Sequence, residues 1–247
     1  MLTSQILLAG LIILISHGLE AVTGFGCTVI ALPFITAIFG IKEGVMIVTI
    51  LALLLALYIV FTNLKYIVIK EYFKILFFMC LGLPIGIYLS SHMKTDVLQT
   101  ILALFIIFVS ILQLTKIYRT LHSDNKPIKE QVHLYHYIIL FAAGIVHGLF
   151  SSGGPLAILY TAKALPEKKQ FRATLCLLWA TLNTIIIITY FVKGTLTKSV
   201  GITTAEMLPF LVIGIIIGEK IHNKVSEVTF KIVIFSSLLV TGIFMIL

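Results

Sequence analysis

Charged residues are scarce in this chain. Asp, Glu, Lys and Arg make up 11% of its 247 residues, hydrophobic residues make up 60%, and the mean hydropathy is +1.13. Soluble domains carry about 25% charged residues, so this composition excludes a soluble globular domain. Four nearly uncharged stretches of about 20 residues can each cross a hydrocarbon core of about 30 Å; they are 44–62, 72–91, 97–115 and 228–247. The sequence therefore predicts a polytopic protein of the lipid bilayer.

Several signals of other chemistry are also missing. The cysteines, Cys27, Cys80 and Cys176, are widely spaced and form no C-x-x-C motif, which indicates buried thiols. No G-x-x-x-x-G-K-[ST] run is present, so drive by ATP would need another subunit. The net charge of +8 comes from basic residues in short connections, where they act as topology signals. We expect no cofactor, no metal and no nucleic-acid partner.

Two sequence patterns recur at nearly the same offset. His17-Gly18-Leu19 reappears 130 positions later as His147-Gly148-Leu149, and Gly82-x-x-x-Gly86 reappears 132 positions later as Gly214-x-x-x-Gly218. A duplicated unit of about 125–130 residues explains both offsets. We predict a first transmembrane repeat at 1–115, a connecting loop at 116–133 and a second repeat at 134–247.

Each predicted repeat contains five apolar segments without period-2 alternation, so the fold is expected to be all-α. The first two segments of each repeat are short (2–17 and 25–39, then 134–147 and 155–164) and are joined by the glycine-rich runs 18–24 and 148–154. The last of these short segments would form about 15 Å of helix, half a membrane. Each pair is therefore either a re-entrant hairpin or two short tilted spans, and three transmembrane helices follow it.

Basic residues test the orientation of the repeats. If each short pair returns to its starting side, the halves are inverted, and 14 of the 18 Lys and Arg residues fall on one side. The four on the other side are Lys42, Lys94, Lys193 and Lys198. Parallel halves would divide the same residues 9 to 9. The positive-inside bias therefore favours inverted repeats in the cytoplasmic membrane, with both termini outside and the connecting loop in the cytoplasm.

The two breaks between short helices are candidate anion sites. Thr23-Gly24-Phe25-Gly26 and Ser151-Ser152-Gly153-Gly154 each precede an apolar helix. A helix that begins inside the membrane points unpaired N–H groups and a positive dipole end at the break. Glycines let a ligand approach the backbone, and the hydroxyls add donors. The alternative is that the glycines only permit close helix packing, which is our interpretation of Gly82, Gly86, Gly214 and Gly218.

The runs His17–Gly26 and Gly148–Pro155, together with the chain length, resemble the sulfite exporter TauE/SafE family. The resemblance covers essentially the whole chain. It implies a cytoplasmic-membrane transporter of sulfur-containing anions, such as sulfite or organosulfonates. Relatives carry different anions, so the resemblance does not select one of them.

Four further residues are candidates for function. His17 and His147 are expected one residue before each break, where a histidine could take up a proton and couple it to the anion. The alternative is a neutral imidazole that bonds a freed carbonyl group. Glu20 is an intramembrane carboxylate suited to a proton-coupling role rather than to direct anion contact. Asn183 could donate to the substrate or bridge two helices.

The predicted function is secondary transport of a small anion by alternating access, with no enzymatic activity. A passive anion channel that uses the same residues is one alternative. A less favoured one is an intramembrane serine hydrolase, with His147 and Ser151 or Ser152 as the reacting pair. The sequence leaves the direction of transport, the coupling ion and the oligomeric state open.

Overall fold

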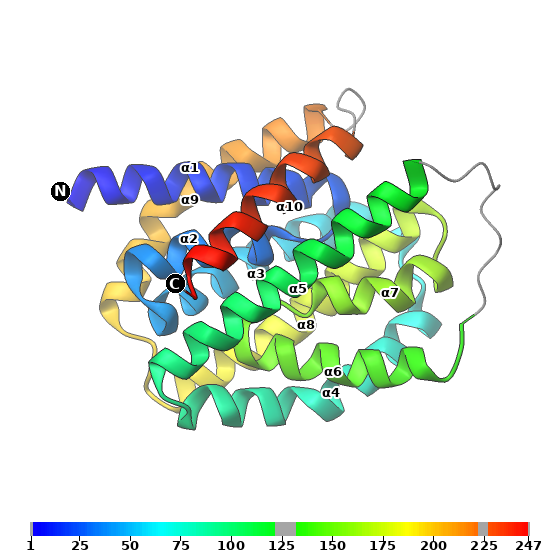
Figure 1. The fold of residues 1–247 in the computed structure, drawn as a ribbon, viewed down its shortest axis with the longest axis horizontal. Helices are drawn as coiled ribbons and strands as arrows, with labels where there is room; N and C mark the ends of the chain where they lie inside the picture. The colour runs from blue at the N-terminus through cyan, green and yellow to red at the C-terminus, as the bar shows by residue number, and fades with distance from the viewer. Residues whose placement is uncertain (1, 122–131, 222–226, 247) are drawn as a thin grey trace.

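The computed structural model describes residues 2–121, 132–221 and 227–246, and these contain helices and no strand. The first half supplies five α-helices and one 3-10 turn: α1 (Leu2–Thr23), α2 (Cys27–Phe39), α3 (Ile41–Asn63), η1 (Leu64–Tyr66), α4 (Ile69–His92) and α5 (Thr95–Leu121). The second half supplies five more: α6 (Tyr135–Phe150), α7 (Gly154–Ala164), α8 (Lys168–Val192), α9 (Lys198–Ile221) and α10 (Glu227–Phe244). Figure 1 shows them as one elongated helical bundle.

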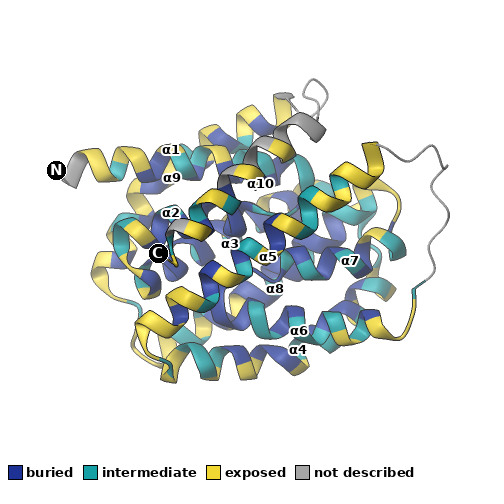
Figure 2. Ribbon diagram, viewed as in Figure 1, coloured by how far each residue is buried: buried dark blue, intermediate teal, exposed yellow. Residues whose placement is uncertain are grey.

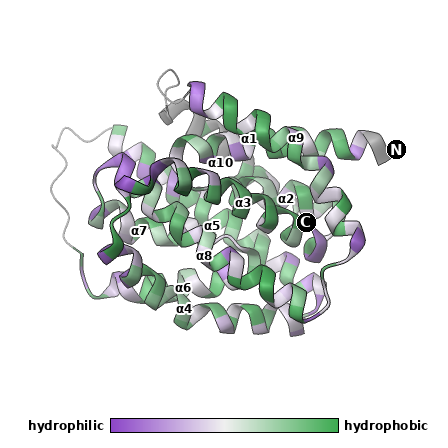
Figure 3. Cartoon of the chain, turned by 180° about the vertical axis from the view of Figure 1, so that it is seen from behind, coloured by the Kyte–Doolittle hydropathy of each residue, from purple (hydrophilic) through white to green (hydrophobic). Residues whose placement is uncertain are grey.

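Six helices of the described part are long and apolar enough to cross a membrane, namely α1, α3, α4, α5, α8 and α9. Hydrophobic residues cover the middles of the helices, and polar residues gather toward their ends (Figure 3). Large hydrophobic side chains such as Phe73, Phe77 and Leu81 are exposed on the outer face of α4. Exposed apolar surface of this extent is typical of contact with lipid. These observations confirm an all-helical, multi-span membrane protein.

The interior is built around α3 and α8. Figure 2 shows both helices largely buried, whereas α1, α4, α5 and α9 expose one face. The two central helices pack against each other. The 3-10 turn at the end of α3 meets the start of α8, where Lys169 lies over the Tyr66 ring at 5.1 Å. The end of one helix therefore lies beside the start of the other, and α3 and α8 are antiparallel.

The same packing relations occur twice. The first helix of each half packs against the fourth helix of the other half, α1 on α9 and α6 on α4. The two third helices pack together, and so do the two fifth helices, α5 and α10. This reciprocal pattern is what a two-fold relation between duplicated units produces. Both described chain ends lie at one end of the bundle, opposite the end of α5 and the start of α6 (Figure 1).

Glycines set the close contacts between first and fourth helices. A Cβ atom at Gly86 would overlap the carbonyl oxygen of Ile145, and one at Gly218 would overlap that of Gly18. A Cβ at Gly148 would lie 2.5 Å from the carbonyl oxygen of Leu83. Small residues that let backbones touch are a common means of helix association in membranes. The packing interpretation of the Gly-x-x-x-Gly pairs agrees with these contacts.

Several predicted segment ends fall short of the ends of the helices. The first segment was expected to end at His17, but α1 continues to Thr23; the first segment of the second half was expected to end at His147, but α6 continues to Phe150. The reason is that Gly18 and Gly148 are helical residues in helix–helix contacts rather than break residues. Helix α5 continues to Leu121, past the predicted end at 115. Of the predicted loop 116–133, residues 122–131 lie outside the described residues.

Candidate functional site

Each half contains one short break between its first two helices. Between α1 and α2, Gly24 and Gly26 adopt left-handed backbone angles, with φ of 82° and 106°. Between α6 and α7 the left-handed residue is Ser151, with φ of 52°. Serine is uncommon in this region, and here its N–H donates to the His147 carbonyl oxygen at 2.7 Å, which closes the end of α6. The breaks are therefore 24–26 and 151–153, shorter than predicted.

The two breaks meet beside α8. The Thr28 hydroxyl, in the first turn of α2, lies 3.5 Å from the Ser152 Oγ. The indole N–H of Trp179 on α8 donates to the Gly24 carbonyl oxygen at 3.2 Å. A Cβ at Gly154 would lie 3.9 Å from the Phe25 Cβ. The structure thus brings together the start of α2 and the start of α7, two segments about 125 residues apart in the sequence.

His147 holds the second break in place. Its ring stacks on Trp179, with ring centroids 5.4 Å apart. The Gly153 N–H donates to Nδ1 at 3.4 Å, so Nδ1 carries no proton in this arrangement and Nε2 donates to the Asn183 Oδ1 at 3.0 Å. Both ring nitrogens have partners. A neutral imidazole was expected to bond a freed carbonyl group; it bonds a freed N–H instead. Asn183 bridges α8 to α6.

The two serines of the second break have different partners. The hydroxyls of Ser151 and Thr49 are 2.6 Å apart, and Thr49 donates to the Val45 carbonyl oxygen at 2.6 Å. Ser151 is therefore the donor to Thr49, and its hydroxyl proton ties the break to α3. Ser152 is fully buried and accepts from Thr28, while its own hydroxyl proton has no acceptor among the described residues. The Ser152 hydroxyl can therefore donate its proton in a hydrogen bond to a ligand.

The first break uses its own polar groups. The Thr23 Oγ1 lies 3.0 Å from the Leu19 carbonyl oxygen and 2.8 Å from that of Phe25, so this hydroxyl stabilises the turn. Glu20 is 3% exposed, and its Oε2 accepts from the Cys27 N–H at 2.8 Å. A carboxyl group of the chain therefore already lies at the start of α2. The start of α7 has no such carboxyl group, since Phe150 takes the matching position.

His17 lies inside α1, and its predicted place one residue before a break was wrong, as it was for His147. The His17 side chain is fully buried, and its Nδ1 lies 3.1 Å from both the Ile13 carbonyl oxygen and the Ser16 Oγ. Its Nε2 has no hydrogen-bond partner among the described residues. The two equivalent histidines therefore differ, because His147 is fully bonded and His17 keeps one ring nitrogen open.

Gly153 and Gly154 differ in what surrounds them. A Cβ at Gly153 would overlap the Ala143 carbonyl oxygen, so this glycine permits close packing of the break on α6. A Cβ at Gly154 would meet only Trp179 and Phe25, at ordinary distances of 3.8 and 3.9 Å. Gly154 is the first residue of α7, and Pro155 follows it, so the helix opens with a proline that lacks an N–H. The backbone at Gly154 is the more accessible of the two.

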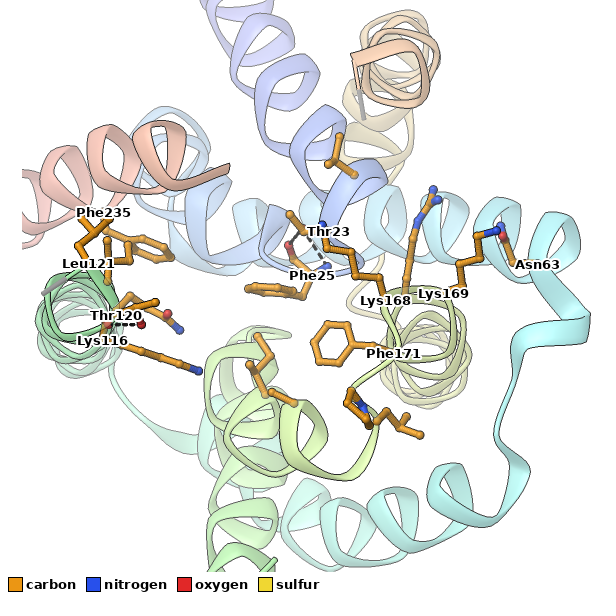
Figure 4. Close-up of a pocket in the computed structure, with 18 residues that line it drawn as sticks. Thr23, Phe25, Asn63, Lys116, Thr120, Leu121, Lys168, Lys169, Phe171 and Phe235 are labelled. Carbon is orange, nitrogen blue, oxygen red and sulfur yellow. Dashed lines mark hydrogen bonds between the residues drawn. The ribbon is translucent and has the colours of Figure 1, made fainter. Parts of the chain in front are cut away.

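A cavity of about 520 Å³ opens on the other side of Phe25. Its lining includes Thr23, Phe25, Lys116, Lys168 and Phe171. The rings of Phe25 and Phe171 meet edge to face at 6.2 Å, and Figure 4 shows them at the centre of the opening. Ser152, Gly154 and Trp179 do not line this cavity. Phe25 therefore lines the cavity and also lies beside the start of α7.

Sequence reasoning missed Thr28, Thr49 and Trp179. Thr28 and Thr49 have no local signal, since isolated threonines in apolar helices are usually satisfied by the preceding turn. Trp179 had one signal, because it is the only tryptophan of the chain. No group of three or more His, Cys, Asp or Glu residues that could hold a metal occurs in the part of the chain that is described.

Among the described residues, no hydrogen bond joins the His147 ring to the hydroxyl of Ser151 or Ser152, and a serine nucleophile is activated by such a bond to its base. In comparisons with known proteins, the family model described as Sulfite exporter TauE/SafE matches residues 7–245. No curated protein and no solved structure gives a significant match.

Proposed function

Because the chain belongs to the sulfite exporter TauE/SafE family of transmembrane transporters, we propose that it carries a small sulfur-containing oxyanion across the cytoplasmic membrane by alternating access. The substrate class is sulfite or an organosulfonate. The observation that carries the proposal is that the two breaks meet at the start of α7, where the chain places no carboxyl group. Transport of labelled sulfite, sulfate, thiosulfate and taurine-like sulfonates into proteoliposomes tests it, and failure of the whole panel would refute it.

In this proposal the anion lies between the two breaks, against the first turn of α7. The N–H groups of Gly154 and Leu156 and the Ser152 hydroxyl are its donors. The helix α7 has 11 residues, and its N-terminus, the positive end of the helix dipole, points at this place. Asn183 contributes by holding His147. At the first break, Thr23, Gly24 and Gly26 shape the turn, and Phe25 closes the site from the cavity side.

Removal of the Ser152 hydroxyl is expected to weaken anion binding. Hydrogen bonds to charged groups are worth about 1.5–3 kcal/mol, so Ser152→Ala should raise the Kd of the transported anion roughly ten- to a hundredfold. Calorimetric titration of the purified protein measures this. The control is Ser110→Ala, because Ser110 is equally buried but donates to the Ile106 carbonyl oxygen within α5. Equal affinities in both variants would place the anion elsewhere.

We also propose that the two repeats are inverted, with both termini outside. The antiparallel packing of α3 on α8 supports this, because parallel repeats would point equivalent helices in the same direction. On a background without Cys27, Cys80 and Cys176, an impermeant thiol reagent added to intact cells should label Thr195→Cys and spare Glu167→Cys. Both positions are exposed, in the connections at opposite ends of α8. The reverse labelling pattern would contradict the proposed orientation.

Accumulation of the anion against its gradient distinguishes a transporter from a passive channel.

Proton coupling through Glu20 or His17 stays a prediction, and the open Nε2 makes His17 the better of the two histidine candidates. If His17 carries the proton, His17→Gln retains anion exchange but loses acceleration by a pH gradient. Unchanged acceleration would assign His17 to structure.

A further inference from the structure

A small second cavity adjoins the cavity of about 520 Å³ and lies beside the two breaks. Its volume is about 20 Å³, which is room for about one water molecule. Its lining includes Gly26 of the first break and Pro155 in the first turn of α7. A Cβ atom at Gly26 would meet no atom within 4 Å, so the backbone borders open space there. The small cavity therefore reaches the place where the anion is proposed to bind.

Four residues line both cavities and form the boundary between them: Thr23, Phe25, Gln113 and Phe235. The Thr23 hydroxyl is used in the turn of the first break, where its Oγ1 lies 2.8 Å from the Phe25 carbonyl oxygen. The two phenylalanine rings carry no hydrogen-bond donor. Among the described residues of this boundary, Gln113 on α5 is thus the one side chain with donors that are not already used.

The Gln113 amide has no hydrogen-bond partner within the described ranges. It is half-buried and lies eight residues before the end of α5 at Leu121, about 12 Å along the helix axis. Amide side chains of membrane helices usually bond a neighbouring helix. By contrast, Asn63 and Thr120, two other polar residues of the large cavity, bond carbonyl oxygens of their own helices at 3.0 and 2.9 Å. The Gln113 amide is therefore available to a ligand.

The repeated fold does not itself require an amide at this position. Helix α10 is the counterpart of α5 in the second half and packs against it. The residues 130 and 132 positions after Gln113 are Ile243 and Met245, both apolar. A glutamine that the packing of α5 and α10 needed would be expected in both copies. Gln113 therefore belongs to the path between the cavities rather than to the shared architecture.

We propose that Gln113 binds the transported oxyanion as it passes between the large cavity and the start of α7. The inference rests on the proposed function and adds a residue outside both breaks to the path of the anion. The amide N–H groups replace water around the anion at a point where Phe25 and Phe235 offer it no donor. Since the small cavity holds about one water molecule, these rings must move to let the anion pass, and Gln113 bonds it there.

Counterflow in proteoliposomes of labelled sulfite, or of whichever panel anion the wild type carries, tests the role of Gln113. Gln113→Leu has a similar size but no donor, so its KM should rise about tenfold, the effect of one lost hydrogen bond to a charged group. Gln113→Glu keeps the shape and adds a negative charge that repels the anion, so its KM should rise about a hundredfold. Gln113→Asn retains the amide and should stay within about threefold of the wild type. All three should keep the wild-type unfolding temperature in detergent.

Gln99→Leu and Gln99→Glu are the matched controls, because Gln99 is an exposed glutamine of the same helix and lines neither cavity. Both should retain the wild-type KM. Equal KM values in the wild type, Gln113→Leu and Gln113→Glu would overturn the inference. So would a lower unfolding temperature in Gln113→Leu with no rescue of KM by Gln113→Asn, since that result assigns the amide to structure.

Failure of this inference is distinct from failure of the proposed function. Normal KM values in the Gln113 variants, together with weaker anion binding in Ser152→Ala, would remove Gln113 from the path and leave the site at α7 in place. Absence of wild-type transport for the whole panel would instead refute the proposed function, on which the role of Gln113 depends.

Discussion

Replacement of Gly154 by valine is expected to abolish transport while the protein still folds and reaches the membrane. A Cβ at this position meets only Trp179 and Phe25 at ordinary distances, so the backbone can accept a side chain. The added methyl groups would cover the first turn of α7 and block the anion from the N–H groups of Gly154 and Leu156. Loss of two charge-assisted hydrogen bonds, at about 1.5–3 kcal/mol each, should lower the transport rate by a hundredfold or more.

The measurement is sulfite counterflow in proteoliposomes, normalised to the amount of protein inserted. Gly154→Ala should give an intermediate loss, because a single methyl group covers less of the turn. The matched control is Gly201→Val in the first turn of α9, where a Cβ would have no neighbouring atom within 4 Å. Normal counterflow by Gly154→Val at normal expression would show that the anion does not pass this backbone.

Replacement of Gly86 by valine is expected to destabilise the whole bundle. A Cβ there would overlap the Ile145 carbonyl oxygen and lie 2.8 Å from the Gly148 Cα. Both neighbours are backbone atoms of α6 and cannot rotate away, so α4 and α6 must separate. Overpacking of a dense interior typically costs about 1–3 kcal/mol and occasionally more; with two backbone clashes we expect about 3 kcal/mol or more, measured as a lower unfolding temperature in detergent.

The contact between α1 and α9 allows the same experiment at a second glycine. Gly218→Val should have a comparable effect, because its Cβ would overlap the Gly18 carbonyl oxygen across the α1–α9 contact. The control is Ile85→Val, since Ile85 adjoins Gly86 but is 44% exposed on the outer face of α4. If both glycine variants unfold at the wild-type temperature, the close contacts do not carry stability.

Much of the fold could be predicted because its signals are local. Long apolar runs specify membrane helices, and the repeated glycine motifs favour two related halves. The boundaries failed at Gly18 and Gly148 for a physical reason. A glycine next to a histidine gives the same local signal whether it ends a helix or lets two helices touch. Only the packing of α9 and α4 against these residues decides between the two.

The candidate site was predictable in part. Hydroxyl and glycine residues before a helix mark its start, so the sequence pointed to both breaks. The assignment of each hydroxyl was not predictable, because it depends on distant partners. Ser151 bonds Thr49, which is 102 residues away, and this contact leaves Ser152 as the available donor. The hydrogen bond from the Cys27 N–H to Glu20 depends on the sharp turn between the two residues. Because of this bond, the starts of α2 and α7 are not equivalent, although the sequence motifs suggested that they would be.

The position of Trp179 gives this protein a built-in optical probe. It is the only tryptophan in the chain, its indole N–H binds the first break, and its ring stacks on the histidine that binds the second. Light that excites tryptophan selectively therefore excites one ring, at the point where the two breaks meet. Any rearrangement that separates the breaks changes the surroundings of that ring, so tryptophan fluorescence of the unlabelled protein would detect such a rearrangement.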